Sequence, residues 1–596
     1  MNNQIFVENC RSEFNFLKNP NNISNLLASH IQIKNGGYLI PLSLIHLEND
    51  EIVNNLWSWR EQHSYAYPSR SKTNVESTKN WIKKAIIENP DRILFLIYDE
   101  NQKFVGHAGF ADASNSSCEL EFDNILRGVE NSRKGLMYDV MTTLESWARS
   151  VLFPNSFYLR VLESNKHAVE FYKKIGFVED RRYGLVKETL ENGFRLVESN
   201  DSHSKDEIVD SFIVMKPAVK KNIGEKMILT AGPSIGSREK VFALDAATNG
   251  WNNEWSKYLT LFEKKFAEYV GVKYAIATSS CTGALHISLN ALGIGPGDEV
   301  IVPEVTWVAS ANAIRYVGAT PVFADIDKKT WNISPESIKK LINKNTKAII
   351  PVHLYGNPCD MDEIMKIAKD NKLFVVEDAA PSIGAEYKGK KTGSFGDFAA
   401  FSFQGAKLAV TGEGGMICTN DDELYKKAYR IWDQGRIPGT FWIEELGVKY
   451  KMSNIQAALG LGQIIRNDSM VEAKRRINSW YKERLKSLES IDFWEEEPNT
   501  KCIYWMTNIR LNEKAGIARD EFCKLLKEKN IDTRPVFPAI SQYPYWPKKQ
   551  EPQPLANELG ISGINLPSGV ALSKEEIDYI CDNIIEILES KKSTKI

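Results

Sequence analysis

One apolar run that ends in two acids limits the folds open to this chain more than any other feature. Residues 373–376 are Leu-Phe-Val-Val, and Glu377 and Asp378 follow directly. Such a run is typical of a strand buried on both faces of a parallel sheet. Open α/β sheets bind ligands at the carboxyl ends of such strands. The pattern predicts an α/β fold with a ligand site at Asp378, the alternative being that Asp378 only caps the next helix.

A lysine follows a second apolar run. Residues 398–403 read as a strand, and Lys407 lies between them and the glycine-rich turn at residues 411–415. Burial lowers the pKa of an amine, so more of it is neutral and able to condense with an aldehyde. Lys407 is therefore a candidate Schiff-base former, although a lysine beside glycines is more often simply solvated.

A third segment has the composition of a phosphate site. Residues 278–285 read Thr-Ser-Ser-Cys-Thr-Gly-Ala-Leu, after a strand-like run at 274–277, and open an apolar-periodic helix at 284–292. Small residues at a helix start expose backbone N–H groups and the positive end of the helix dipole. An ordinary Ser/Thr cap is the alternative. With Lys407, and with Asp378 facing a pyridine nitrogen, the segment predicts a site for pyridoxal phosphate (PLP).

From about residue 228 to about residue 590, the chain resembles the nucleotide-sugar aminotransferases of the DegT/StrS type, which are PLP enzymes of fold type I. The resemblance rests on many segments in the family's order, among them GPSIGSREK, GIGPGDEVIVPEVTWVASANAI, VHLYGNPCDMDEI, EDAAPSIGAEYKGKKTGSFGD, KYKMSNIQAALGLGQI and DTRPVFPAI. It implies a large domain built on a mainly parallel sheet, followed by a small C-terminal subdomain. It also implies amination of a keto-sugar.

The resemblance assigns roles to individual residues. Lys407 would form the Schiff base with PLP, and Asp378 would pair with the pyridine nitrogen. The residues implied to hold the phosphate or stack on the ring are Cys281, Thr282, Ser402 and Trp307. Asn454 would reach the cofactor phosphate of a neighbouring subunit, which implies a homodimer or a larger homo-oligomer.

Two positions refine this comparison. Many relatives carry glutamine three residues after the aspartate, where this chain has Pro381. Proline cannot supply the glutamine's hydrogen bond, so the tuning of the cofactor ring is expected to differ. Some relatives replace the lysine with histidine and become dehydratases, whereas this chain keeps Lys407.

Within the family, WDQGRIPGTFW, KYKMSNIQAALG and DTRPVFP look most like GDP-perosamine synthases. That similarity implies amination at C4 of a nucleotide-linked 4-keto-6-deoxyhexose, with L-glutamate as the amino donor. Such products feed O-antigen or other surface glycans. A different keto-sugar, or a cyclitol, remains the alternative acceptor.

Length and charge bound the remaining possibilities. A chain of 596 residues is too long for one core and predicts at least two domains. A formal net charge of -2 gives no reason to expect nucleic acid binding. The N-terminus lacks the pattern of a signal peptide, and no apolar run approaches the ~20 residues that span a membrane. The 8 cysteines show neither C-x-x-C nor zinc spacing, which favours reduced thiols in a cytoplasm and no metal site.

The chain divides by pattern into four stretches. Residues 1–35 are polar and are expected to be a loosely packed N-terminal arm or a couple of short helices. Residues 36–217 alternate strand and helix patterns and predict an α+β domain. A basic, pattern-breaking stretch at 218–227 is the expected linker, and residues 228–596 hold the aminotransferase domain.

The α+β domain resembles the GNAT acyl-CoA N-acyltransferases. Residues 164–177, SNKHAVEFYKKIGF, match that family's C-terminal motif, and residues 132–141, SRKGLMYDVM, lie where its pyrophosphate loop is found. The second match is degenerate, since Met137 occupies a small-residue position. Backbone N–H groups at a helix start would receive the diphosphate of acetyl-CoA. The residues expected to bind the cosubstrate are Arg133, Lys134, Gly135, Leu136 and Asn165.

Acylation of an amine needs proton transfer. The amine must lose a proton and the leaving thiolate must gain one. Tyr172 resembles the family's acid, with core packing as the alternative. Glu119 and Glu121 share one strand face, and we expect Glu121 to be the base, with a plain polar strand face as the alternative.

The two predicted activities are sequential, because one makes an amine on a sugar and the other acylates amines. The sequence therefore predicts a bifunctional enzyme. The competing hypothesis is an aminotransferase joined to a GNAT-fold module that only binds or assembles.

Overall fold

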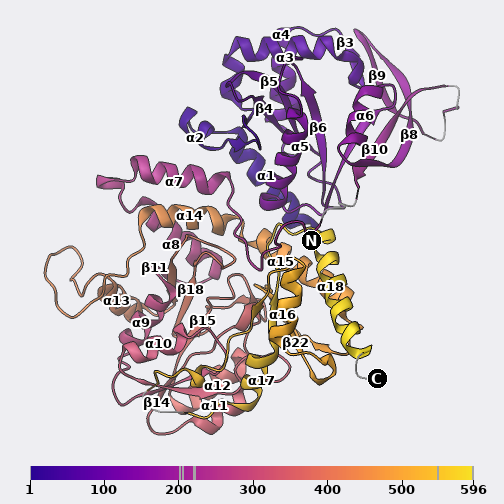
Figure 1. Ribbon diagram of the computed structural model, residues 1–596. Coiled ribbons are helices and arrows are strands. Elements are labelled where there is room, and N and C mark those ends of the chain that lie inside the picture. The colour runs from indigo at the N-terminus through magenta and orange to yellow at the C-terminus, as the bar shows by residue number, and fades with distance from the viewer. Residues whose placement is uncertain (1, 201–202, 205–206, 219–222, 547–549, 594–596) are drawn as a thin grey trace. The chain divides into compact units, whose positions relative to one another are not determined.

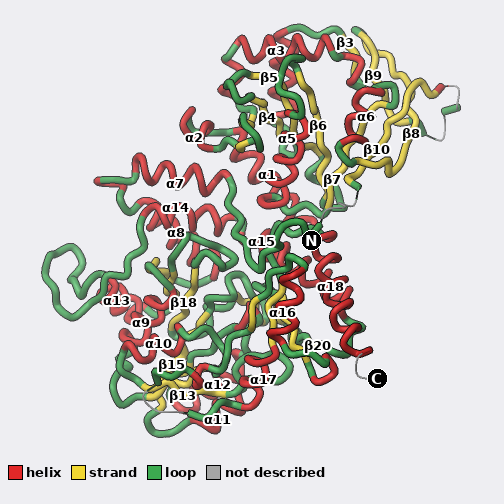
Figure 2. The backbone as a smooth tube through the Cα atoms, in the orientation of Figure 1, coloured by secondary structure: helices red, strands yellow, loops and turns green. Residues whose placement is uncertain are grey.

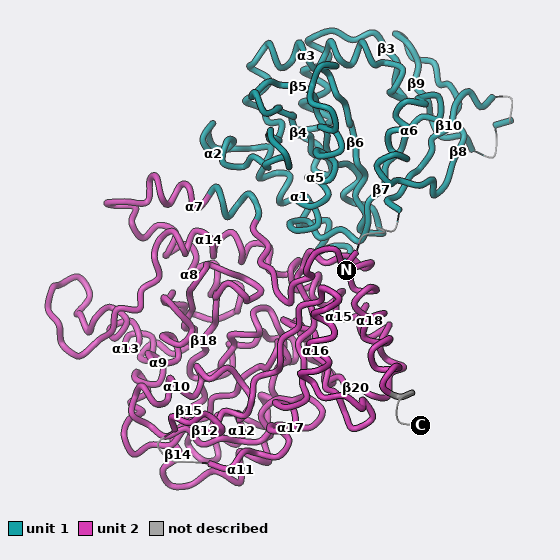
Figure 3. Tube along the Cα trace, viewed as in Figure 1, with its two compact units in different colours: residues 1–221, 236–241 teal, residues 222–235, 242–596 magenta. Residues whose placement is uncertain are grey.

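The computed structural model describes residues 2–200, 203–204, 207–218, 223–546 and 550–593. The chain forms two compact units, which comprise residues 1–221 with 236–241, and residues 222–235 with 242–596 (Figure 3). Residues 219–222 of the expected linker lie outside the described part. Within the described residues, no helix has both the length and the apolar character needed to cross a membrane.

Unit 1 is built on one mixed sheet, with strands yellow in Figure 2. In its described residues the sheet is 10-stranded and runs in the order β1 (Ile31–Gln32), β2 (Tyr38–Pro41), β4 (Ile93–Tyr98), β5 (Phe104–Ala111), β6 (Glu119–Arg127), β7 (Ser156–Leu162), β10 (Ile208–Pro217), β8 (Phe177–Leu190), β9 (Gly193–Glu198), β3 (Ser69–Ser71). The β6–β7 pair is parallel, and the other neighbours are antiparallel.

The helices of unit 1 include four that the residue pattern predicted. They are α3 (Asp50–Gln62), α4 (Val75–Trp81), α5 (Leu136–Val151) and α6 (Lys166–Lys174). α4 continues as a π-helical turn, η3 (Ile82–Ile87). The apolar face of α5 is buried in one core with β5, β6 and β7, because its apolar residues recur at helical spacing.

The N-terminal stretch is packed and helical, which agrees with the expected pair of helices and not with the alternative of a loose arm. It forms α1 (Asn3–Lys18) and the short α2 (Ile23–Ala28). Phe6, Phe14 and Leu17 of α1 are buried in the core that contains α5. The ammonium group of Lys18 donates hydrogen bonds to the carbonyls of Ile86, Asn89 and Arg92. These residues lie on one helix face, so the polar composition hid an amphipathic helix.

Besides the short β1 and β3, two longer strands of unit 1 were not expected from the sequence. β8 and β9 pair along residues 185–198 and extend the sheet beyond β10. Eight of their 20 residues are both exposed and charged, and the two strands lack the alternation of apolar and polar residues that marks a half-buried strand.

Unit 2 contains the predicted mainly parallel sheet. In the described residues its order is β11 (Tyr274–Thr278), β19 (Gly415–Thr419), β18 (Phe398–Ser402), β15 (Phe374–Asp378), β14 (Thr346–Ile349), β12 (Glu299–Pro303), β13 (Thr320–Ala324). The strands from β18 to β13 are parallel, and β19 and β11 add antiparallel pairs. The predicted strand before Asp378 is β15, and its carboxyl end lies beside that of β18.

Helices surround this sheet (Figure 1). They are α7 (Ser237–Asn249), whose residues 237–241 are counted with unit 1, α8 (Lys257–Val270), α9 (Cys281–Ala291), α10 (Ala309–Tyr316), α11 (Pro335–Leu341), α12 (Met361–Asn371), α13 (Asp422–Trp432), α14 (Asn454–Ile465) and α15 (Asn467–Leu485). α9 packs on β18 and β19. Two short strands, β16 (Glu386–Tyr387) and β17 (Lys390–Lys391), pair with β21 (Thr500–Lys501).

The C-terminal part of unit 2 has a separate small sheet. Its order is β20 (Ile491–Asp492), β22 (Thr507–Leu511), β24 (Gly563–Leu566), β23 (Arg534–Pro535), and its helices are α16 (Arg519–Glu528), α17 (Pro554–Ser562) and α18 (Lys574–Ser593). One core joins this sheet to α15, α16 and α18.

Candidate functional site

Lys407 lies in unit 2, in the turn after β18. Its side chain is half-buried, and burial lowers the pKa of its amine to about 8. The Asp378 carboxylate and Cys281 act on the same amine and oppose this shift. The amine lies 3.7 Å from the centre of the Trp505 ring, and within the described residues it has no hydrogen bond or ion pair. A lysine in this state is poised to react as a nucleophile.

Asp378 ends β15 and is buried. Burial raises the pKa of its carboxyl group, while a hydrogen bond from the Ser310 hydroxyl, 2.6 Å long, works in the opposite direction. Its other oxygen accepts from the Ala380 amide at 3.1 Å. A cationic ligand group facing this carboxylate would favour its charged form. The residue thus fits the role of partner to a protonated pyridine nitrogen.

The neighbouring acid, Glu377, has a structural environment. His353 and Glu377 are fully buried, with His353 Nε2 3.0 Å from the carboxylate. The Cys359 amide donates to His353 Nδ1, so Nε2 carries the proton and donates to Glu377. Three further backbone amides also donate to Glu377. With both its oxygens occupied, Glu377 is less suited than Asp378 to face a ligand.

The predicted phosphate segment begins α9. The Ser280 hydroxyl caps the helix by accepting from the Gly283 amide at 3.0 Å, so Cys281 and Thr282 form its first turn. Amides of a first turn have no partner within the helix and can receive an anion. A Cβ at Gly415 would lie 2.5 Å from the Ser280 backbone. The glycine-rich turn after Lys407 therefore lets β19 approach this helix start closely.

The other predicted cofactor residues differ in how exposed they are and in whether they already have hydrogen-bond partners. Trp307 is 59% exposed, and the centre of its ring lies 5.8 Å from that of Phe537. Ser402 is buried at the end of β18. Asn454 is bound within its own chain, since its side-chain oxygen accepts from the Tyr258 amide at 2.9 Å. Its expected role toward a neighbouring subunit remains a prediction.

Two residues of this site escaped the sequence analysis. Ser310 donates a hydrogen bond from its hydroxyl to the Asp378 carboxylate. In the sequence, only its position three residues after Trp307 places it near a predicted cofactor residue. Trp505 donates from its indole N–H to the Ala406 carbonyl at 2.8 Å and also lies beside the Lys407 amine. No local pattern could have indicated Trp505, because 98 residues separate it from Lys407 in the chain. Both contacts arise only from tertiary packing.

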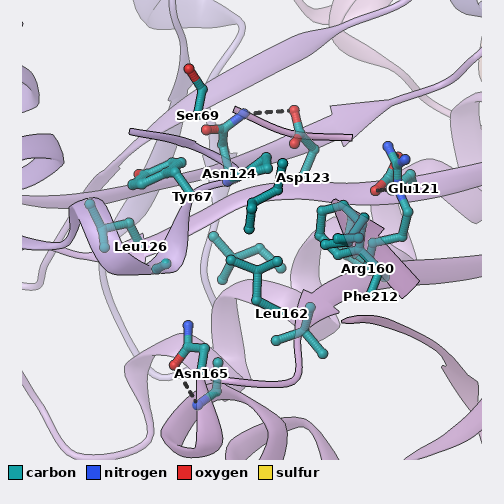
Figure 4. Close-up of a pocket in the computed structure, with 18 of the residues that line it drawn as sticks. Tyr67, Ser69, Glu121, Asp123, Asn124, Leu126, Arg160, Leu162, Asn165 and Phe212 are labelled. Atoms are coloured by element: carbon teal, nitrogen blue, oxygen red, sulfur yellow. Dashed lines mark hydrogen bonds and ion pairs between the residues drawn. The ribbon is translucent and has the colours of Figure 1, made fainter. Parts of the chain in front are cut away.

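In unit 1, the parallel strands β6 and β7 separate part of the way along. Their pairing runs from Glu119↔Ser156 to Phe122↔Leu159, while both strands continue beyond it. Asn124 has a φ of 50°, and the register with β5 shifts there, which is the mark of a bulge. A bulge bends its strand and explains the divergence. A cavity of about 610 Å³ opens at the separation, and we call it the cleft cavity (Figure 4).

The predicted pyrophosphate loop leads into α5. Gly135 has a φ of 85° and precedes the first helical residue, Leu136. This left-handed conformation favours glycine, and a Cβ there would meet nothing within 4 Å, so the backbone is accessible. Arg133 is not free for a diphosphate, because its guanidinium lies 2.8 Å from Asp139. The helix start, rather than this side chain, suits an anion.

The expected base is held in an ion pair. Arg160 Nε and one terminal nitrogen donate to the two oxygens of Glu121 at 2.7 and 2.8 Å (Figure 4). Burial raises the pKa of Glu121, and Arg160 opposes this shift. With both oxygens occupied, Glu121 is less available to an amine than the sequence suggested. Glu119, the other glutamate on this strand face, forms an ion pair with Lys216 at 3.1 Å.

Tyr172 and Asn165 line the cleft cavity, as the resemblance implied. Burial raises the pKa of the Tyr172 phenol, so it keeps its proton near neutral pH and can donate it. The Asn165 side chain caps α6 by accepting from the Ala168 amide at 3.3 Å. Its cosubstrate role is still a prediction, since the capping bond alone explains the residue.

Comparisons with known proteins find a family match for each of the two predicted domains. The model of the DegT/DnrJ/EryC1/StrS aminotransferase family matches residues 233–585, and that of the Acetyltransferase (GNAT) domain matches residues 42–178. GDP-perosamine synthases from Escherichia coli O157:H7 and Caulobacter vibrioides are 43% and 42% identical, over 61% of this chain and 100% and 98% of their own lengths.

Solved structures show the same relationship. Helicobacter pylori PseC, an aminotransferase involved in the biosynthesis of pseudoaminic acid, is 26% identical with a TM-score of 0.58, over 61% of this chain and 100% of its own. S. venezuelae DesV, in complex with a ketimine intermediate, is 30% identical with a TM-score of 0.56, over 59% of this chain and 94% of its own.

These matches confirm both predicted fold classes. They also confirm PLP and acetyl-CoA as the small molecules used by proteins with these two domains. The chain carries a GNAT acetyltransferase domain, and it belongs to the DegT/DnrJ/EryC1/StrS aminotransferase family.

Proposed function

We propose that this chain makes an N-acetylated amino sugar in two steps. Unit 2 would transfer an amino group from L-glutamate to a nucleotide-linked 4-keto-6-deoxyhexose, and unit 1 would acetylate the new amine with acetyl-CoA. The observation that carries the proposal is the pairing, in one chain, of the reactive Lys407 amine with an acyltransferase cleft. The product of the first reaction has the functional group that the second consumes.

In unit 2, the residues present suit PLP. When bound, PLP supplies an aldehyde and an electron-withdrawing ring. Lys407 would hold it covalently, Asp378 would keep its ring nitrogen protonated, and Ser310 would fix the carboxylate toward that nitrogen. The start of α9, with Cys281 and Thr282, would receive the phosphate. The free Lys407 amine has a pKa of about 8, which suits a group that takes up and returns protons near neutral pH.

The sugar assignment rests on the relatives. Two similar curated proteins, matched over 100% and 98% of their own lengths, are GDP-perosamine synthases. We therefore infer a GDP-linked, perosamine-like substrate, whose product would feed O-antigen or a related surface glycan. All 8 cysteines are free thiols in the structure, which suits a reducing cytoplasm.

Mass spectrometry of the products tests the proposal directly. The protein with PLP, L-glutamate and acetyl-CoA is incubated with GDP- or dTDP-linked 4-keto-6-deoxyhexose. We expect an amino sugar when acetyl-CoA is omitted and its N-acetyl form when it is present. Acetyl-CoA should be consumed only when glutamate is also supplied. Amination without any acetylation would disprove the second step.

The second candidate function is amination alone, without acetylation, and three features of unit 1 favour it. Arg133 is paired with Asp139, Glu121 is paired with Arg160, and Met137 stands at a small-residue position of the loop. Unit 1 would then be a binding or assembly module. Calorimetry with acetyl-CoA separates the two, since an active domain must bind it.

We propose that the aminotransferase works as a homodimer or a larger homo-oligomer. Phe441 is 95% and Leu446 is 92% exposed, and Trp442 beside them is also exposed. Large apolar side chains exposed together mark an interaction surface. Light scattering should give at least a dimer, and Leu446→Ser should shift the protein toward monomer. A fully active monomer would refute both the dimer and the role of Asn454 across it.

We also propose that the two halves fold as separate domains joined at residues 218–227. A piece ending at Lys216 and one starting at Gly224 are each long enough for a core. Residues 236–241, however, are counted with unit 1, where Arg238 lies 3.1 Å from Glu13. We therefore expect both pieces to fold, with the N-terminal piece less stable than in the full chain. Separate thermal melts would measure this.

A further inference from the structure

A second cavity in unit 1 borders the cleft cavity. It has a volume of about 810 Å³, and we call it the arginine cavity because Arg92, Arg160, Arg181 and Arg182 all line it. The two cavities share five lining residues, which are Arg92, Glu121, Arg160, Tyr183 and Glu198. These form a common wall. The two cavities therefore adjoin along these residues.

Of the two cavities, the cleft cavity is the one that suits acetyl-CoA. It lies at the separation of β6 and β7 and is lined by Tyr172 and Asn165. Neither residue lines the arginine cavity. The arginine cavity is thus left for the second substrate, and its charged residues should match that substrate.

Most charged residues of the arginine cavity already have partners. Asp91 pairs with Arg11, Arg92 with Asp123, Glu121 with Arg160, and Arg182 with Glu163 and Glu179, while Asp112 accepts a hydrogen bond from the Tyr158 hydroxyl. Within the described residues, Arg181 and Glu198 are the cavity's charged groups without a hydrogen bond or ion pair. Both are exposed. One positive and one negative group are therefore open to a ligand.

The two unpaired residues, Arg181 and Glu198, lie in different parts of the arginine cavity. Arg181 lines only the arginine cavity, whereas Glu198 belongs to the shared wall. Val214 pairs with Arg160 on one side and Arg181 on the other, so these three lie in one row across the sheet. Two strand spacings put Arg181 about 10 Å from Arg160 and the wall. Glu198 pairs with Leu185, four residues and about 13 Å along β8 from Arg181.

A ligand that fits must carry an amine at one end and an anion at the other. We propose that the arginine cavity is the acceptor subsite of unit 1, in which Arg181 binds a diphosphate and Glu198 orients the amine at the shared wall. An amino sugar linked to a nucleotide diphosphate has this arrangement, with a sugar ring between the charges. Guanidinium groups suit phosphate because they donate two parallel hydrogen bonds. This assignment rests on the proposed acetylation.

The reaction balances without another reactant. The acceptor nitrogen bonds to the acyl carbon as the C–S bond of the thioester breaks. The nitrogen loses one proton and the sulfur gains one. Glu198 is placed to receive the first proton, since Glu121 is engaged by Arg160, and Tyr172 is placed to supply the second.

The test compares two acceptors that share the amine and differ in the anion. GDP-perosamine and free 4-amino-4,6-dideoxymannose are each titrated with saturating acetyl-CoA and the full chain, and thiol release is followed. Arg181→Gln should raise the KM for GDP-perosamine by about 10- to 100-fold, the range of a lost charge-assisted hydrogen bond. It should leave kcat/KM for the free sugar and the KM for acetyl-CoA unchanged. Arg181→Lys should recover part of the loss.

Two further variants complete the test. Arg195→Gln is the matched control, because Arg195 is an exposed arginine on β9 that pairs with Glu188 and lines neither cavity. It should behave as the wild type. Glu198→Gln should lower kcat/KM for both acceptors by the same factor, because it acts at the amine.

The outcomes are distinct. If the wild type releases no thiol with either acceptor, the proposed acetylation fails, and this assignment fails with it. Suppose that the wild type acetylates. If Arg181→Gln keeps the normal KM for GDP-perosamine, or if its kcat/KM falls by the same factor for both acceptors, only the role of Arg181 is overturned. Normal rates for Glu198→Gln would overturn the role of Glu198.

Discussion

The two candidate sites treat their charged groups in opposite ways. In unit 2, the Lys407 amine has no hydrogen bond or ion pair within the described residues. The Trp505 ring lies beside it, and the Asp378 carboxylate only partly offsets the lowering of its pKa by burial. In unit 1, Glu121 and Arg133, both expected to act on substrates, are paired with Arg160 and Asp139. An unpaired amine keeps the low pKa that burial gives it, whereas an ion pair holds its charges in place. Unit 2 is thus prepared for covalent chemistry, and unit 1 for positioning.

Removing Lys407 should have the largest effect. Lys407→Ala removes the nucleophile, so amination should fall by roughly 10⁴-fold or more, the scale of such losses. Acetylation of a supplied amino sugar should be unchanged, because unit 1 has its own site. Product mass spectrometry and the visible spectrum of the PLP-loaded protein would measure both. Wild-type amination by the variant would refute the central assignment of unit 2.

Neutralising Asp378 should have the next largest effect. Asp378→Asn keeps the shape and can still accept from Ser310, but an amide cannot keep a ring nitrogen protonated. We expect turnover to fall by roughly 10²- to 10³-fold, as when one preorganised electrostatic group is lost, while PLP still binds. Glu377→Gln is the informative contrast, since it should mainly lower the melting temperature. An unchanged kcat for Asp378→Asn would reassign the carboxylate.

In unit 1, Tyr172→Phe should lower acetylation by roughly 10²-fold, the low end for a positioned general acid. The change keeps the ring that packs 6.2 Å from Phe177 and 5.5 Å from Phe171, so folding should be preserved. Amination should not change. Normal acetylation by this variant would mean that the thiolate takes its proton from water.

The smallest expected effect is on the pH dependence of PLP binding, which tests whether the Lys407 amine is unpaired, unlike the charged groups of unit 1. The pKa of Lys407 is lowered to about 8, so its amine is protonated below that pH and neutral above it. Only the neutral form attacks an aldehyde. Binding of PLP to the cofactor-free protein should therefore speed up about 10-fold per pH unit below pH 8 and level off above it. Stopped-flow absorbance would show this, and a rate still rising at pH 10 would indicate an amine of ordinary pKa.

By itself, the sequence determined the order and kind of the two folds. Short apolar runs such as residues 373–376 predicted β15, because a strand buried on both faces must be apolar throughout. Positions directly after apolar runs, together with the family resemblance, also pointed to Lys407, Asp378 and the start of α9. These features are local, so a local pattern suffices to read them.

The tertiary structure alone decided which of these groups are free. Trp505 beside Lys407, Ser310 on Asp378 and Arg160 on Glu121 come from distant parts of the chain. The partly exposed strands β8 and β9, and with them Glu198, were missed because their charged residues carry no apolar alternation. Whether a charge is paired or open depends on contacts between residues far apart in sequence, and no local pattern records such contacts.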